Sequence, residues 1–156
     1  MTGNLTWLKA YMPTLRSAAN FCFNLIEEDT HLLFAPGSLM IDVFIRNNYT
    51  ADSNAMLVGF LREFAEAEEL VGNATGGVVL RQMALDMSIA VNTLLWASPG
   101  RGLGSDDHYI TQVNLDNTTR DFVDYDSNLI AVAHEIPDLA RAKQVGWGQV
   151  SAMARG

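Results

Sequence analysis

Apolar side chains recur at helical spacing along most of the chain, and capping residues mark where several of these stretches begin and end. A first helix is predicted from about Pro13 to Glu28, because proline in the first helical turn costs no hydrogen bond. The clearest helix begins with a cap at Asp52 or Ser53 and ends at Gly72, since glycine favours a left-handed stop. Its apolar stripe consists of Met56, Leu57, Phe60, Leu61, Phe64, Ala67 and Leu70.

The segments on either side of this helix differ in character. Residues 32–48 contain a Pro-Gly pair ahead of an apolar run, which predicts a loop with a short extended piece. Gly76 and Gly77 predict a turn, and residues 79–96 then form a third helix. Because apolar residues occupy nearly all sides of that helix, we expect it to be deeply buried.

A small β-hairpin is predicted near residues 108–123. Residues 108–113 and 118–123 are rich in β-branched and aromatic side chains. The four residues between them, Asn-Leu-Asp-Asn, have the composition of a tight turn.

The remaining apolar stretches predict a fourth helix over residues 128–135, capped by Asp126 or Ser127, and a fifth over residues 137–145. The chain of 156 residues suits one domain, mostly α, built from antiparallel αα-hairpins. The tripeptide Asp-Ser-Asn begins at residue 52 and again at residue 126, 74 residues later. If the helices pair in order, the second and fourth point the same way, and their starts meet at one end.

Composition excludes several classes of protein. With 49% hydrophobic and 18% charged residues, the chain is globular rather than disordered. Its net charge of −8 and the lack of a basic cluster argue against nucleic acid and anionic membranes as partners. No apolar run reaches the roughly 18–20 residues of a membrane span. Cys22 is the sole cysteine and the three histidines lack ligand spacing, so we expect no disulfide, no metal and no cofactor.

The N-terminus resembles no signal peptide, but four Asn-x-Ser/Thr sequons occur, at Asn4, Asn48, Asn73 and Asn117. They lean toward a secretory-pathway parent protein. The alternative is that Asn and Thr simply favour loops, so the localisation stays open.

Polar residues are densest between Ile41 and Asn54, just ahead of and at the start of the clearest helix. Two carboxylates, a guanidinium, three amides and a phenol fall within these fourteen residues, a composition typical of a site for a polar ligand. A second cluster runs from Asp107 to Asp126. Asp42 is the best candidate for a general acid, because its apolar neighbours favour the protonated form. The alternative for Asp42 is a cap, or a buried partner for Arg46.

This layout resembles the six-hairpin glycosidases, the (α/α)6-toroid glycoside hydrolases. The resemblance is carried by the Asp-bearing segment from Asp42 to Met56, the helix closing at Trp96, the Asp107-His-Tyr turn, and the hairpin leading to residues 124–133. It covers about residues 7–145. A full toroid has twelve barrel helices and this chain offers about five, so the resemblance implies one αα-hairpin domain over residues 1–156, a fragment of a larger catalytic toroid.

The resemblance implies an active site at the N-terminal ends of the inner helices. Glycoside cleavage needs two carboxyl groups across the scissile bond. We expect Asp42 and Asp124 to be catalytic. The expected substrate-binding residues are Arg46, Asn47, Asn48, Tyr49, Asp107, His108 and Tyr109.

The resulting hypothesis is a glycoside hydrolase-like domain that acts on carbohydrate by acid/base catalysis. Its alternative is a non-catalytic helical module that binds carbohydrate or protein. A partial toroid leaves an apolar flank open, so we also expect association with a companion domain or with itself.

Overall fold

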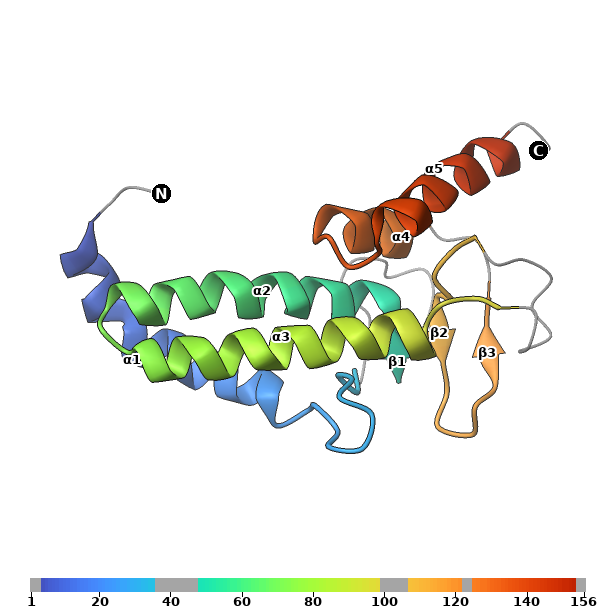
Figure 1. Cartoon of the computed structure of the whole chain (residues 1–156). Helices are drawn as coiled ribbons and strands as arrows, with labels where there is room; N and C mark the ends of the chain where they lie inside the picture. Colours follow the sequence, from blue (N-terminus) through green and yellow to red (C-terminus); the bar gives the residue numbers. More distant parts are fainter. Residues whose placement is uncertain (1–3, 36–47, 99–106, 122–124, 154–156) are drawn as a thin grey trace.

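The two longest helices lie side by side at the centre of the fold (Figure 1). The structure is a computed structural model that describes residues 4–35, 48–98, 107–121 and 125–153. Within these residues the helices are α1 (Leu5–Phe23), α2 (Ala51–Leu70), α3 (Ala74–Leu94), α4 (Tyr125–Ala133) and α5 (Leu139–Met153). The strands are β1 (Tyr49–Thr50), β2 (Gln112–Val113) and β3 (Thr119–Arg120). The predicted mostly helical fold with a small β-hairpin is therefore confirmed.

A tight connection joins α2 to α3 and makes them an antiparallel hairpin. Gly72 ends α2 with φ +96°, as predicted, and the Asn73 side chain caps α3 by accepting a hydrogen bond from the Gly76 N–H at 3.1 Å. Gly76 and Gly77 therefore lie in the first turn of α3, and the predicted turn there is wrong. A Cβ on Gly77 would lie 2.6 Å from Glu69 Cγ, so glycine is needed for the close approach of α3 to α2.

The expectation that α3 is buried on nearly all sides is also wrong. Its buried residues, such as Leu80, Ala84, Met87 and Val91, lie on the side that faces the core. Val78 and Ile89 are exposed on the other side, at 65% and 56%. The apolar composition of α3 therefore led to a prediction of more burial than the described residues provide.

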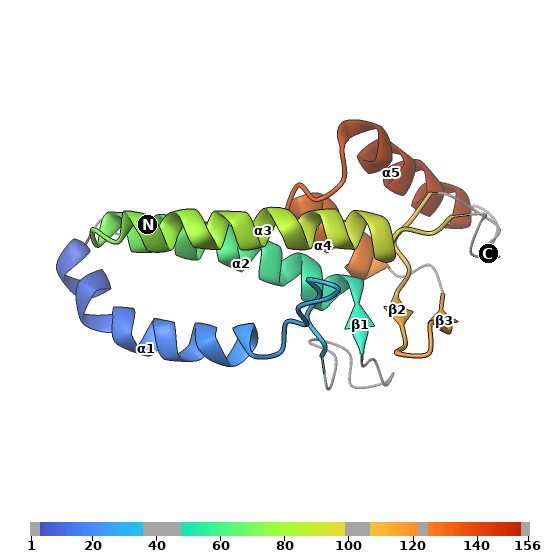
Figure 2. The same cartoon turned by 60° about the horizontal axis from the view of Figure 1, so that its bottom comes forward.

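The first helix starts and ends earlier than predicted. Asn4 caps α1 by accepting a hydrogen bond from the Trp7 N–H at 3.0 Å, so Pro13 lies inside the helix rather than in its first turn. Figure 2 shows α1 running alongside the α2–α3 hairpin. Only Met12 and Ala19 of α1 are buried, so α1 is the least embedded of the three long helices.

The predicted hairpin is present but shorter than expected, and a third strand joins it. β2 pairs with β3 with Val113 opposite Thr119, and Asn117 has φ +61° in the turn. β1, which directly precedes α2, pairs antiparallel with β2. The sheet order β1-β2-β3 therefore ties the hairpin to the start of α2.

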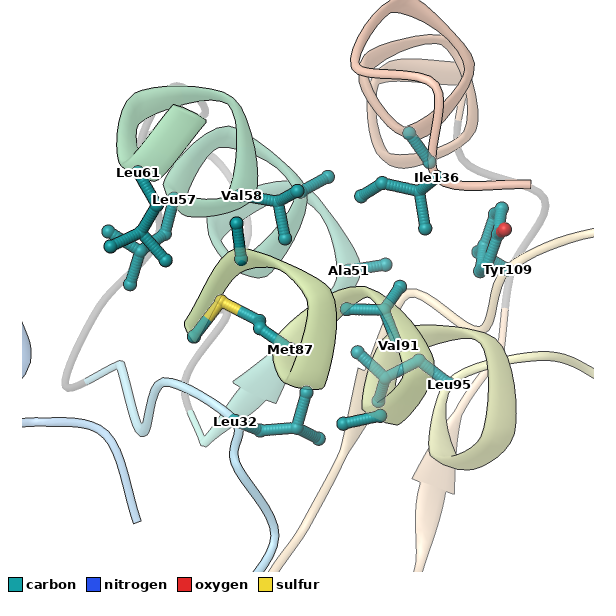
Figure 3. Close-up of a cluster of buried hydrophobic side chains, with 14 of the residues drawn as sticks. Leu32, Ala51, Leu57, Val58, Leu61, Met87, Val91, Leu95, Tyr109 and Ile136 are labelled. Atoms are coloured by element: carbon teal, nitrogen blue, oxygen red, sulfur yellow. The ribbon is translucent and has the colours of Figure 1, made fainter. Parts of the chain in front are cut away.

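One hydrophobic core joins these elements. Figure 3 shows side chains of α2 and α3 packed between Leu32 below and Ile136 above. The core residues labelled there are Leu32, Ala51, Leu57, Val58, Leu61, Met87, Val91, Leu95, Tyr109 and Ile136. Each is 8% exposed or less, and the core also includes Met12 and Ala19 of α1 and Val145 of α5.

The two C-terminal helices also differ from their predicted bounds. α4 begins at Tyr125, three residues before the predicted start, and α5 continues to Met153 instead of ending near Val145. Asp138 caps α5 by accepting a hydrogen bond from the Arg141 N–H at 2.9 Å. Gly146 does not stop α5, so the predicted end there is wrong.

The helices form two similar consecutive units. After α1, the Phe34 N–H donates to the Leu25 carbonyl at 2.8 Å, and after α3 the Ile110 N–H donates to the Leu95 carbonyl at 2.7 Å. Each unit therefore consists of a helix, a bridged extended segment and a second helix that begins with Asp-Ser-Asn in its first turn. α1 corresponds to α3, and α2 corresponds to α4.

Candidate functional site

The same backbone clasp holds the start of α2 and the start of α4. Asn54 Oδ1 accepts a hydrogen bond from the Leu33 N–H at 2.7 Å, and Asn54 Nδ2 donates to the Leu33 carbonyl at 3.2 Å. Asn128 makes the corresponding bonds with Tyr109, at 2.7 and 3.4 Å. Both asparagines are fully buried. The repeated tripeptide thus fixes each helix start to the extended segment of its own unit.

The two helix starts flank one short segment, residues 109–111. The Ala51 N–H at the start of α2 donates to the Thr111 carbonyl at 3.4 Å, while Asn128 of α4 binds Tyr109. Further along, Arg62 of α2 donates to the His134 carbonyl just after α4. α2 and α4 therefore run in the same direction, and their N-termini lie at the same end of the molecule (Figure 1). We call these two N-termini and residues 107–113 between them the helix-start site.

The first residues of the two tripeptides are not the caps that the sequence predicted. Thr50 is the N-cap of α2, so Asp52 and Ser53 lie within the first turn. Asp52 is 3% exposed, and its Oδ1 accepts a hydrogen bond from the Ser53 N–H at 2.6 Å. Asp126 lies in the first turn of α4 and is half-buried. Carboxylates at both positions complement the positive ends of the helix dipoles.

One buried polar atom at this site has no hydrogen-bond partner among the described residues. It is the hydroxyl of Thr50, which is fully buried at the N-cap of α2. An unpaired buried hydroxyl costs free energy in the fold.

His108 lies between two carboxylates at the outer edge of the helix-start site. Its Nδ1 is 2.8 Å from Asp107 Oδ1, and its Nε2 is 2.8 Å from Asp121 Oδ1. The pKa of His108 is raised, mainly by the hydrogen bond to Asp121. Burial of the ring lowers this pKa, and the hydrogen bond to Asp107 raises it further. Asp107 and Asp121 therefore both bind the ring of His108, one at each nitrogen.

Asn48 and Tyr49, both predicted to bind substrate, take part in local structure. Asn48 has φ +64°, and its Nδ2 donates to Asn114 Oδ1 at 2.9 Å. The Tyr49 hydroxyl donates to Glu27, and burial together with this bond raises the pKa of Tyr49. Both residues are thereby fixed at the base of the helix-start site.

Tyr109 belongs to the core. It is fully buried, its hydroxyl donates to Asn92 Oδ1 at 2.7 Å, and its ring packs edge-on against Trp96. Burial raises the pKa of its phenol well above the ordinary value. Its backbone, rather than its side chain, takes part in the helix-start site.

Four of the predicted site residues, Asp42, Arg46, Asn47 and Asp124, lie outside the described residues. Their flanking residues are described. Ala35 and Asn48, on either side of residues 36–47, exchange two backbone hydrogen bonds of 2.9 and 2.8 Å. Asp124 directly precedes the first residue of α4. In the sequence, residues 42–47 therefore lead into β1 and α2, and Asp124 leads into α4.

The sequence did not single out Asn54, Asn128, Thr50 or Asp121. The repeat of Asp-Ser-Asn was the available signal for the two asparagines, but capping preference directed attention to Asp and Ser. For Thr50 and Asp121 we find no signal in the sequence.

The four sequon asparagines all have local structural roles. Asn4 and Asn73 are helix N-caps, while Asn48 and Asn117 adopt positive φ. These positions are ones that asparagine favours without glycosylation.

Two further searches cover the described residues only. None of the helices there is long and apolar enough to span a membrane. In the same residues, no group of three or more His, Cys, Asp or Glu side chains is arranged to hold a metal ion.

Comparison with solved structures shows a likeness of fold to a glycoside hydrolase. The chain superimposes on part of the crystal structure of a GH78 family rhamnosidase of Bacillus sp. GL1 with a TM-score of 0.77 and 17% sequence identity. The match covers 93% of this chain but only 15% of that one. No protein-family model and no curated protein sequence matches the chain. The chain therefore shares a fold with part of a larger glycoside hydrolase.

Proposed function

We propose that this chain is part of an (α/α)6-toroid glycoside hydrolase and that the helix-start site binds a sugar for hydrolysis. The observation that carries the proposal is the meeting of two equivalent helix starts at residues 109–111. The two repeated units, with α2 and α4 parallel, are what consecutive hairpins of such a ring require. The likeness to a rhamnosidase fold supports this arrangement and suggests a rhamnoside as the substrate class.

In this proposal the catalytic carboxyl groups are Asp42 and Asp124. Asp42 acts as the general acid and protonates the leaving-group oxygen, while Asp124 is the second carboxylate across the scissile bond. Arg46 and Asn47 hold sugar hydroxyl groups, with Asn48 at the base of the site.

Asp107 and His108 lie at the rim of the same site. The Asp107 side chain is 43% exposed, so it can accept a hydrogen bond from a sugar while it still contacts His108. The buried phenols of Tyr49 and Tyr109 support the site from below rather than contacting the sugar.

Catalysis in this proposal also needs a companion domain. An apolar groove of about 390 Å³ lies between α1 and α2, lined by residues that include Leu15, Cys22, Met56 and Phe60. On α1, Phe21 is 68% exposed. Apolar surface of this kind on two neighbouring helices supports docking of further helices. It equally supports the second candidate, a helical module that binds carbohydrate or protein without cleaving it.

Hydrolysis of a chromogenic α-L-rhamnoside, and of a panel of other glycosides, by this chain together with its companion domain tests the proposal. Asp42→Asn should abolish turnover while leaving the circular dichroism spectrum and thermal unfolding unchanged. Asp86→Asn, on α3 away from the site, is the matched control and should retain turnover. Full turnover in Asp42→Asn would remove the mechanism. Sugar binding without product release by the unmutated protein would favour the non-catalytic module.

A further inference from the structure

Both ring nitrogens of His108 are already engaged. Each lies 2.8 Å from a carboxylate oxygen, and the side chain is 7% exposed. An ionised carboxylate can only accept, so when both aspartates are ionised both nitrogens donate and the ring is an imidazolium. A general base needs a free nitrogen, and this geometry leaves none.

The equivalent position in the first unit shows that a charged group is not required there for folding. His108 precedes Tyr109, which Asn128 clasps, and Leu32 precedes Leu33, which Asn54 clasps. Leu32 is 1% exposed and belongs to the core. An apolar side chain thus fills the position in one unit and a cation in the other. Because burial of a cation costs free energy, its use at this position indicates a further role.

The bonds of His108 join two elements that are distant in sequence. Its carbonyl accepts a hydrogen bond from the Ala97 N–H at 3.0 Å, which anchors its backbone to the segment after α3. Asp121 directly follows β3, and α4 begins four residues later at Tyr125. The ring of His108 therefore holds the end of β3 against the segment that follows α3, just before the chain enters α4.

We propose that His108 is a positioning residue whose doubly protonated ring fixes the exit of β3, and with it the start of α4, at the helix-start site. The clamp is defined here as His108 with Asp107 and Asp121. This inference rests on the proposed function in one respect, because the start of α4 is one of the two helix starts proposed to bind the sugar. The clamp itself is measured without a sugar, so its failure and the failure of the proposed function are separate results.

The clamp should open as the pH rises. Among the described residues, the charged groups that face the ring are Asp121 from the end of β3 and Asp107 from its own segment. The segment after α3 contributes the backbone N–H of Ala97, which binds the His108 carbonyl. Once the ring loses a proton, one nitrogen presents a lone pair to a carboxylate oxygen and the two repel each other. Since the pKa of His108 is raised, the clamp is intact at and below the ordinary histidine pKa and opens as pH passes through the higher value.

Nitrogen-15 NMR of the full chain tests the protonation state directly. At pH 7 we expect the doubly protonated signature for the His108 ring. A neutral His108 ring at pH 7 would overturn the proposal.

Hydrogen exchange, corrected for the intrinsic effect of pH, then tests positioning. In Asp121→Asn the amides of residues 119–121 and 125–128 should lose protection by about tenfold or more at pH 7. Asp86→Asn should match the unmutated protein. His108→Leu, which copies the first unit, should fold and show protection of these amides that no longer varies with pH. Unchanged protection in Asp121→Asn, or a pH dependence that survives in His108→Leu, would contradict the proposal.

Discussion

The tripeptide Asp-Ser-Asn stands in the first turn of two helices, where its asparagine makes the same contacts and its aspartate lies in different surroundings. Asn54 and Asn128 make the same pair of backbone hydrogen bonds. The carboxylates differ, because Asp52 is 3% exposed whereas Asp126 is only half-buried. The amide is therefore the structural constant of the repeat, and the environment of the carboxylate is where the two units diverge.

The largest expected effect comes from removing the clasps. Asn54→Ala leaves the buried backbone N–H and carbonyl of Leu33 without these partners, at a cost of about 2–4 kcal/mol in the free energy of unfolding. Asn128→Ala should cost a similar amount at Tyr109. Urea unfolding followed by circular dichroism measures both. A loss at only one of the two positions would break the equivalence of the units.

Leu32 and His108 precede the two clasped residues, and exchanging their side chains should lower the free energy of unfolding by unequal amounts. Leu32→His places an unpaired polar ring in the core and should cost about 2–5 kcal/mol. His108→Leu should cost far less, because Asp107 and Asp121 can each contact water once the ring is gone.

The stability that His108 contributes should depend on pH, whereas the contribution of Leu32 should not. In the unmutated protein the His108 contribution to stability is complete below the ordinary histidine pKa and is lost as pH rises through the raised pKa. The His108→Leu variant should lack this decline. Denaturant unfolding at a series of pH values between about 6 and 9 measures it. Equal pH dependence in both proteins would show that His108 is not the group responsible.

How far the sequence predicted this arrangement depends on the distance between partners. The Gly72 stop and the turn at Asn117 rest on the conformation of single residues, so local chemistry was enough to predict them. The clasps join residues 21 and 19 positions apart, and a repeated tripeptide does not show what it binds. The prediction that α3 is buried on nearly all sides was wrong for a related reason. The composition of a helix does not show which of its sides other elements cover.

The site could be predicted in outline only. The shared location of the two helix starts followed from the order of the helices, although the main hairpin is α2–α3 rather than a pairing of the first two helices. Asp121 could not be predicted, because it reaches His108 through the fold of the β-hairpin.

A smaller effect should distinguish the two carboxylates. Asp52→Asn alters a buried group that accepts the Ser53 N–H, and we expect a loss of about 1 kcal/mol. Asp126→Asn changes a half-buried group and should stay within about 0.5 kcal/mol of the unmutated protein. Thermal unfolding of the two variants side by side measures the difference. Equal losses would mean that burial does not separate the two positions.

The claim that both helix starts face one ligand is tested most directly by NMR titration with methyl α-L-rhamnopyranoside. We predict that the backbone amides of Ser53 and Ser127 shift together and saturate along one binding curve. Shifts confined to one helix start, or to the groove between α1 and α2, would contradict a shared sugar site.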